Sequence, residues 1–159
     1  MIAQLKTLLH LKKLKEVAAI RLVHTKRREV LEAREVIEVC KKRVRASLET
    51  LAAREDAVYR KVLGRVVDFA EIDLTKGKLQ MIEVEHGKLV DAVARAVHVH
   101  DRLENELAEA IAIHHKTVKD RDKYVELTEG LDVELNAHTA RQEESEVEEL
   151  FGNRVRKLA

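Results

Sequence analysis

Apolar side chains return at every seventh position along most of this chain. Counted from Ile2, position a of the heptad falls on nine residues of the first half, and all but Glu16 are apolar: Ile2, Leu9, Glu16, Val23, Val30, Ile37, Val44, Leu51 and Val58. A period of seven is typical of α-helices that pair along one face. The d positions between them are small or mixed, so the first half predicts a long helix with a narrow apolar seam.

The second half keeps the same period in a frame counted from Leu79. Its d positions are Ile82, Leu89, Ala96, Leu103, Ala110, Thr117, Tyr124 and Leu131, and its a positions are Leu79, His86, Val93, His100, Leu107 and His114. Beyond Leu107 the apolar line drifts toward Ile111, Val118 and Val125, as happens when a straight helix departs from a strict seven-residue repeat. We therefore expect a second long helix whose pairing loosens toward its end.

A short interruption separates the two patterns. Residues 73–78 combine two candidate N-cap residues, Asp73 and Thr75, with Gly77, which can adopt a positive φ. Proline is absent from all 159 residues, so no proline breaks either helix. The pattern predicts an all-α fold with one domain over residues 1–159: a helix over about 2–72, a turn over about 73–78, a helix over about 79–150 and a short basic C-terminal tail. One continuous helix with a kink at Gly77 is the competing interpretation.

The distribution of charge favours a hairpin. Residues 1–79 carry 19 Lys and Arg against 11 Asp and Glu, whereas residues 80–159 carry 11 against 18. An antiparallel fold would lay residues 1–45, with 13 basic and 5 acidic side chains, beside residues 107–151, with 5 basic and 12 acidic. Exposed ion pairs contribute only about 0.2 to 0.5 kcal/mol each. Many pairs with the basic residue on the first helix and the acidic residue on the second can nevertheless determine how the two helices are oriented. We therefore expect a long two-helix antiparallel coiled-coil hairpin.

The composition argues against a conventional globular core. Charged residues make up 37% of the chain and aromatic residues 3%. Cys40 is the only cysteine, so no disulfide can form within the chain, and no apolar run approaches the roughly 20 residues that span a bilayer. The lysines among the leucines of residues 1–15 do not resemble a secretory leader. We expect a cytoplasmic protein that does not insert into a membrane and is a monomeric hairpin by itself.

Catalytic and cofactor motifs are missing from the sequence. The five glycines are scattered, so none forms a phosphate-binding loop. A nucleophile would have to be Cys40, Ser47 or Ser145 held in a pocket, which a pair of helices does not provide. The eight histidines include no pair three or four residues apart, the spacing that a zinc pair on one helix needs. We predict no enzyme activity, no cofactor and no metal.

Three histidines on the a line of the second half are spaced by fourteen residues: His86, His100 and His114. They can fill shallow seam positions with their edges in water. Alternatively, they can weaken the pairing when protonated, because the unperturbed histidine pKa lies near 6.5.

Two basic runs, residues 26–28 and 41–43, resemble basic segments that bind nucleic acid. Both lie among glutamates and lack the interleaved aromatic residues that stack bases. Solvated helix faces, or faces that meet an acidic partner, explain them better, and we predict no nucleic-acid binding.

The two ends of the chain resemble those of YscO-type proteins of bacterial type III secretion systems. The beginning combines Met1, Ile2 and Leu5 with a basic stretch at residues 12–15, followed by Glu16, Ala18 and Ala19. The far end, residues 141–151, reads Arg-Gln-Glu-Glu-Ser-Glu-Val-Glu-Glu-Leu-Phe and leads into a short basic tail. Length and hairpin layout agree with this family, which includes the flagellar homologue FliJ. The chain departs from some members in having a glycine and no Trp near its turn.

The resemblance implies a coiled-coil stalk, similar to the helical pair of a rotary ATPase's central shaft, at the cytoplasmic side of an inner-membrane secretion apparatus. It implies that the end with both termini enters the hexameric ring of the secretion ATPase, that the body or turn approaches the export gate protein, and that secretion chaperones are recycled. The ATPase-facing candidates are then Leu5, Leu8, Leu9, Lys12, Lys13, Glu144, Glu148, Leu150 and Phe151. The gate-facing candidates at the turn are Phe69, Ile72, Leu74 and Met81.

Simpler explanations compete with these assignments. Seam packing would account for the leucines, solvation for the charges, and local packing for the residues at the turn. A generic coiled-coil scaffold or adaptor, or a shaft subunit of a rotary ATPase, would show the same heptads. A scaffold would dimerise by itself, whereas a stalk would be a monomer that alters the hydrolysis or oligomerisation of its ATPase.

Overall fold

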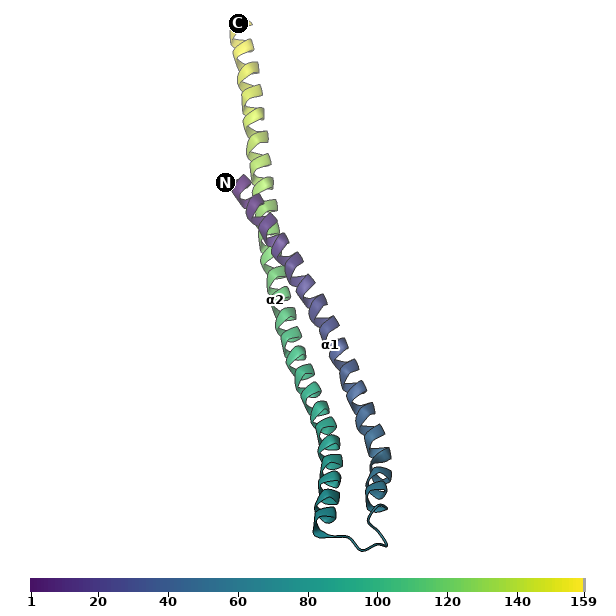
Figure 1. Cartoon of the computed structure of the whole chain (residues 1–159). Coiled ribbons are helices and arrows are strands. Elements are labelled where there is room, and N and C mark those ends of the chain that lie inside the picture. Colours follow the sequence, from purple (N-terminus) through teal and green to yellow (C-terminus); the bar gives the residue numbers. More distant parts are fainter. Residues whose placement is uncertain (159) are drawn as a thin grey trace. The chain divides into compact units, whose positions relative to one another are not determined.

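The protein consists of two long helices, α1 (Ile2–Tyr59) and α2 (Phe69–Leu158), in a computed structural model that describes residues 1–158. No strand occurs among these residues. The helices run in opposite directions (Figure 1). Side chains of α1 contact side chains of α2 in hydrogen bonds such as Arg34 to Glu104 and Arg121 to Glu16. The predicted all-α fold of two antiparallel helices is confirmed.

The chain divides into two compact units, and each contains a stretch of both helices. The turn unit comprises His24–Glu109, and the terminal unit comprises Met1–Val23 together with the described part of α2 from Ala110 onward. Each unit is an antiparallel helix pair with its own seam. The single domain expected for residues 1–159 stays a prediction.

In the turn unit, α1 and α2 lie side by side up to the segment that connects them (Figure 1). Val30 at position a and Ala33 at position d are buried, with 5% and 8% of their surfaces exposed. Across the pair, Nη2 of Arg34 lies 3.3 Å from Oε1 of Glu104. The heptad frame therefore describes this seam, and small d residues such as Ala33 explain its narrowness.

The turn lies at residues 60–68, so the predicted turn at residues 73–78 is wrong. α1 ends at Tyr59 and not near residue 72, and α2 begins at Phe69 and not near residue 79. Within residues 1–158, Gly64 is the only residue with a positive φ, at 77°. A residue with no Cβ adopts that conformation without steric strain, which is why the chain reverses there.

α2 begins where its first backbone N–H groups find an acceptor. The Oδ1 atom of Asp68 accepts a hydrogen bond of 2.8 Å from the backbone N–H of Glu71, the geometry of an N-cap. Further along, the hydroxyl of Thr75 donates to the carbonyl of Glu71 at 2.8 Å, one turn back within the helix, and does not cap a new one. Gly77 therefore lies inside α2. A glycine in a helix interior costs only about 1 kcal/mol relative to alanine, which does not break a long helix.

Alanine at each of these two glycines should change stability in opposite directions. Gly64→Ala puts a side chain at φ 77° and should lower the free energy of unfolding by about 1 kcal/mol. Gly77→Ala should raise it by about 1 kcal/mol, because alanine favours helix and nothing lies within 4 Å of the added Cβ. Urea unfolding followed by circular dichroism measures both changes. A turn at Gly77 would reverse the two signs.

In the terminal unit, the first part of α1 packs against the middle of α2. Val23 of α1 is only 2% exposed, and Ala110 and Thr128 of α2 are 3% and 6% exposed. Ala110 occupies position d and Thr128 position a, so the second heptad frame continues past Leu107. The residues of the expected drift are half-buried beside this seam: Ile111, Val118 and Val125.

The helices of the terminal unit pair about two heptads away from the expected register. Nζ of Lys6 lies 3.1 Å from Oδ1 of Asp132. Laying residues 1–45 beside residues 107–151 would instead place Lys6 near residue 146. The expected alignment of the two chain ends is therefore wrong by fourteen positions.

α2 continues alone beyond this pairing. Every residue from Val133 to Leu158 is exposed, and Figure 1 shows the corresponding light green to yellow part of α2 with no helix beside it. Residues 151–158 are helical, so the predicted end of the second helix near residue 150 and the separate basic tail are wrong. We refer to residues 133–158 as the overhang.

The sequence of the overhang explains why α1 does not pair with it. In the second heptad frame, its a and d positions after Leu135 are His138, Gln142, Ser145, Glu149, Gly152 and Arg156. Apolar residues of α1 laid against these positions would desolvate polar groups without giving them partners. The register observed in the terminal unit keeps the apolar positions of both helices opposite each other and leaves the polar ones in water.

Candidate partner-binding surfaces

Polar side chains that interrupt the apolar seam meet polar partners across it. Glu16 is the one charged a residue of α1, and both of its carboxylate oxygens accept hydrogen bonds of 2.8 Å from Nη1 of Arg121. Arg121 also occupies position a, and its Nη2 donates to Oδ1 of Asp122 at 2.7 Å. A polar pair inside a coiled-coil seam specifies the register, since any slip leaves both groups without partners.

Two lysines at d positions make equivalent contacts, one in each unit. In the terminal unit, Nζ of Lys12 lies 3.8 Å from Oδ2 of Asp120. In the turn unit, Nζ of Lys26 lies 2.7 Å from Oε2 of Glu106. The second pair lies fourteen residues later in α1 and fourteen residues earlier in α2, so both units use the same register.

The ion pair between Lys26 and Glu106 persists over the physiological pH range. Hydrogen bonds to Glu106 and Glu29 raise the pKa of Lys26, and the hydrogen bond from Lys26 lowers the pKa of Glu106. The lowered pKa of Glu106 contributes stability that is present above its unfolded pKa and is lost as the pH falls through the folded value. The raised pKa of Lys26 contributes stability that is present below its unfolded pKa and is lost only in strong alkali.

One seam histidine of the turn unit has a hydrogen-bonded partner on α1. Nδ1 of His86 lies 3.0 Å from the hydroxyl of Ser47, which also accepts a hydrogen bond of 3.0 Å from Nη2 of Arg54. Ser47 occupies position d and His86 position a, so this is another matched polar pair in the seam. A role for protonation of the seam histidines stays a prediction.

One cluster among residues 1–158 has the donor types of a cation site. Ligand atoms of His100, Asp101 and Glu104 lie within 4.8 Å of one another. The guanidinium of Arg34 reaches the same atoms, because its Nε donates to Nε2 of His100 and its Nη2 to Glu104, both at 3.3 Å. The cluster is therefore an ion-pair network between the helices, in which a guanidinium supplies the positive charge.

The α1 members of the predicted ATPase-facing set lie in or beside the terminal seam. Leu5 and Leu9 are half-buried at positions d and a, whereas Leu8 and Lys13 are exposed. Nζ of Lys12 lies 5.2 Å from the centre of a tyrosine ring of α2, a cation–π contact. Packing between the helices thus accounts for Leu5, Leu9 and Lys12, and it leaves Leu8 and Lys13 available to a partner.

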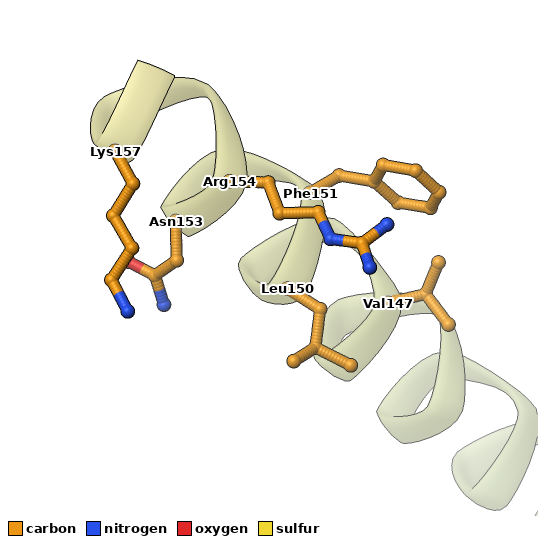
Figure 2. A pocket seen from close by; sticks show the side chains of 6 residues that line it. All are labelled: Val147, Leu150, Phe151, Asn153, Arg154 and Lys157. Atoms are coloured by element: carbon orange, nitrogen blue, oxygen red, sulfur yellow. The ribbon is translucent and has the colours of Figure 1, made fainter. Parts of the chain in front are cut away.

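The α2 members of the set all lie on the overhang. Glu144 and Glu148 are exposed, and Leu150 and Phe151 expose 68% and 62% of their surfaces. A shallow groove on this part of α2 is lined by Val147, Leu150, Phe151, Asn153, Arg154 and Lys157. Figure 2 shows the guanidinium of Arg154 extended along the helix toward Val147 and Phe151, while Asn153 and Lys157 lie on another side.

The apolar residues of the last three turns share one face of α2. The face begins at Val147 and continues with residues three, four, eight and eleven positions later, namely Leu150, Phe151, Val155 and Leu158. Their exposed fractions range from 49% for Val147 to 88% for Leu158. We call these five residues the distal stripe. Three of them were not predicted from the sequence: Val147, Val155 and Leu158. The predicted helix ended near residue 150, so Val155 and Leu158 fell in the expected tail, and Val147 lay in the last turn of that helix.

The predicted ATPase-facing residues form two groups and not one. Lys6 pairs with Asp132, so Glu144 lies twelve residues, or about 18 Å, further along the helix than that contact. Leu150 and Phe151 lie further still. Within the terminal unit, the leucines of α1 and the distal stripe are therefore separate surfaces.

The predicted gate-facing residues are not all exposed. Phe69, Leu74 and Met81 expose 87%, 65% and 63% of their surfaces. Ile72 is half-buried and lines a groove with residues of the turn and of both helices: Tyr59, Val62, Val67, Thr75, Lys76 and Leu79. Two further exposed residues, Leu63 and Val66, were overlooked, because the turn was placed after them.

A family model described as Type III secretion protein YscO matches residues 5–153 of this chain. The chain belongs to the YscO family. The match covers nearly the whole chain and confirms the resemblance carried by its two ends. Comparisons with curated proteins and with solved structures find no match.

Membership of the YscO family connects this chain with type III secretion. The region that matches the YscO model includes both seams, the turn and most of the overhang, with Leu150 and Phe151; Val155 and Leu158 lie beyond it. None of the helices described is long and apolar enough to cross a bilayer.

Proposed function

We propose that this YscO protein is a stalk of a bacterial type III export apparatus, of the injectisome or flagellar kind, that binds the secretion ATPase ring through its terminal unit and the export gate through its turn. The observation that carries the proposal is the overhang, a length of α2 that no other part of the fold covers and that carries an exposed apolar stripe. In this role the protein is cytoplasmic, peripheral to the inner membrane, and neither an enzyme nor dependent on a cofactor.

The distal stripe supports binding to a protein. Most of the stability of a helix in a protein comes from packing an amphipathic face, and isolated helices are marginal in water. The overhang has such a face but nothing in its own fold to pack it on. A partner that buries Leu150 and Phe151 would supply that packing, and each fully buried side chain of this size contributes about 1.5 to 3 kcal/mol.

The charges of the overhang suit a shaft inside a ring. Residues 133–149 contain six glutamates and one arginine. Dispersed charges on a helix steer association and are individually weak. A shaft that meets several equivalent subunits is better served by such contacts than by one deep pocket.

The turn supports the assignment of the gate. Leu63, Val66 and Phe69 expose 70%, 100% and 87% of their surfaces within one connecting segment and the first residue of α2. Adjacent exposed apolar side chains commonly mark a surface that binds another protein. The same surface would serve in recycling secretion chaperones if they are released close to the gate.

Leu150→Ala with Phe151→Ala should weaken binding to the cognate secretion ATPase at least about tenfold, because two anchors of the distal stripe are lost. The measurement is isothermal titration of the ATPase with the full chain, combined with the rate of ATP hydrolysis. Stability should not change, since both residues are exposed on a helix that α1 does not cover.

The matched control is Val133→Ala with Leu135→Ala. These residues also lie on the overhang and expose 67% and 50% of their surfaces, but they stand outside the distal stripe. The control should bind the ATPase like the unmodified protein. An equal loss of ATPase affinity in both variants would mean that the helix as a whole, and not the distal stripe, determines binding. A stable dimer of the unmodified chain that has no effect on the ATPase would overturn the stalk proposal.

A further inference from the structure

One side of the seam of the turn unit combines basic and apolar residues. Arg34 and Glu104 both occupy position e, and their contact at 3.3 Å shows that the e positions of α1 and α2 face each other on this side. Seven residues later in α1 and seven earlier in α2, Lys41 stands opposite Val97. The same step again brings Leu48 opposite Val90, which follows from the heptad register.

A groove confirms that these stretches of the two helices border each other. It is shallow and is lined by Lys41, Val44, Arg45, Val90 and Val93. Val44 and Val93 are a residues of the seam and are half-buried. We call the surrounding surface the basic edge and define it by six residues: Lys41, Arg45 and Leu48 of α1 with Val90, Ala94 and Val97 of α2.

The apolar part of the basic edge is open to solvent. Leu48 exposes 59% of its surface, Val90 46% and Val97 38%. Ala94 is exposed as well, and its small side chain keeps the α2 side of the edge flat. A two-helix fold leaves such a strip uncovered because it has no third element to place on it.

The positive charge of the basic edge is poorly neutralised. Lys41 lies 3.7 Å from Glu38, and both side chains are at least half exposed, so the pairing is weak. No carboxylate of residues 1–158 forms a salt bridge with Arg45 within 4.0 Å. The α2 side of the edge adds no negative charge, since its residues are valine and alanine.

We propose that the basic edge binds an amphipathic α-helix of another protein, one that carries glutamate or aspartate beside its apolar stripe. The apolar stripe of that helix would pack on Leu48, Val90 and Val97 and complete a three-helix bundle. Its acidic flank would lie over α1, where Lys41 and Arg45 supply charge-assisted hydrogen bonds. This surface is separate from the distal stripe and does not depend on the proposed binding to the ATPase.

A helical protein segment fits this surface better than nucleic acid does. The six residues of the basic edge include no aromatic side chain on which a base could stack. Four of them are exposed aliphatic residues, and a phosphate backbone gains nothing from burying these. The charge pattern, basic on one helix and neutral on the other, matches an acidic flank on one side of a partner helix.

The probe is a synthetic peptide of about 21 residues, long enough for about six helical turns, with leucine at positions a and d and glutamate at e and g. Its twin carries lysine in place of glutamate. Binding to the full chain is measured by fluorescence anisotropy at peptide concentrations where each peptide is monomeric. The glutamate peptide should bind, and the lysine peptide should bind at least about tenfold more weakly.

Lys41→Glu with Arg45→Glu should weaken binding of the glutamate peptide at least about tenfold, and Leu48→Gln should also weaken it. The matched control is Lys42→Glu with Arg43→Glu, which changes the net charge equally in the same stretch of α1 but on other faces of the helix. The control should retain binding within about threefold. Circular dichroism of each variant verifies that the helices remain folded.

Three results would overturn the proposal. The first is an equal loss of affinity for the glutamate peptide in the control, which would mean that the peptide is attracted only by the overall positive charge of α1. The second is tighter binding of a DNA duplex than of the glutamate peptide, with the same dependence on Lys41 and Arg45. The third is a dimer in sedimentation that Lys41→Glu with Arg45→Glu dissolves, which would make a second copy of this chain the occupant.

Discussion

Val23→Asp should lower the free energy of unfolding by at least about 3 kcal/mol, because the new carboxylate would enter a seam position that water does not reach. Val23 has the smallest exposed fraction of the buried core residues, 2%. Chemical unfolding followed by circular dichroism measures the loss. Val23→Ala should cost about 2 kcal/mol, since it removes two methyl groups without adding a charge.

The adjacent Leu22 provides the control. It exposes 43% of its surface and lies at the margin of the seam, so Leu22→Asp should cost less than about 1 kcal/mol. Both variants add the same charge one residue apart in the same helix. Equal losses would mean that the seam does not follow the heptad frame counted from Ile2.

The seam was the most predictable part of the fold. Burial on one face of a helix requires apolar residues at a fixed period, and that requirement is visible in the sequence without any knowledge of the partner. The buried residues Ala19, Val23, Val30 and Ala33 all occupy a or d positions of the predicted frame. In α2, Ala110 does the same.

The turn was harder to place, because several short segments carry turn-forming residues. The predicted turn contains Gly77 four residues after Asp73, and the observed turn contains Gly64 four residues before Asp68. Both segments therefore combine a glycine with a possible N-cap residue. The difference lies in Glu71, three residues after Asp68, which completes the Asp-x-x-Glu pattern that starts a helix. The order matters as well: at 64–71 the glycine precedes the cap, as a chain leaving a turn and entering a helix requires.

The partner-binding surfaces stay a prediction, but the exposure of their residues can be compared with the sequence. Leu150 and Phe151 were chosen by position near the end of the chain, and both are exposed on the overhang. Their apolar neighbours Val147 and Val155 were not chosen, although the spacing of three and four residues linked them. The incorrect helix boundary at residue 150 placed Val155 outside the helix and hid the face that it shares with Val147.

The register could not be read from the apolar period alone. A slip by two heptads moves every a residue onto another a position, so the seven-residue period is preserved, although Ile2, Leu5 and Leu9 would then lie against polar positions of the overhang. The polar interruptions break this symmetry. In the expected register Glu16 would face Leu135, fourteen residues beyond Arg121, and would lose the two hydrogen bonds of 2.8 Å that it now accepts.

The same logic applies to the other polar seam residues. Lys12 meets Asp120 and Lys26 meets Glu106, and each pair combines opposite charges. An unpaired charge in a partly buried seam costs more than a pair contributes, so the matched set excludes slipped registers more strongly than it stabilises the native one. Aligning the polar positions of the two helices, and not only the apolar ones, would have identified the register from the sequence.

Spin labels should therefore give a shorter distance between positions 6 and 132 than between positions 6 and 146. The label sites are Lys6→Cys with Asp132→Cys, and Lys6→Cys with Glu146→Cys, both in a Cys40→Ala background that removes the only native thiol. Nζ of Lys6 lies 3.1 Å from Asp132, whereas Glu146 is fourteen residues, about 21 Å, further along α2. Pulsed electron paramagnetic resonance measures both distances in the isolated protein.

A slip of two heptads would reverse the order of these two distances, because position 146 would then lie beside position 6. Glu16→Leu tests the physical cause. Leucine removes the polar partner of Arg121 and makes the a line of α1 apolar at all of its positions, so the penalty against slipped registers falls. The labelled Glu16→Leu variant should show a broader distribution of the distance from position 6 to position 132. A distribution as narrow as that of the unmodified pair would mean that polar matching at Glu16 does not set the register.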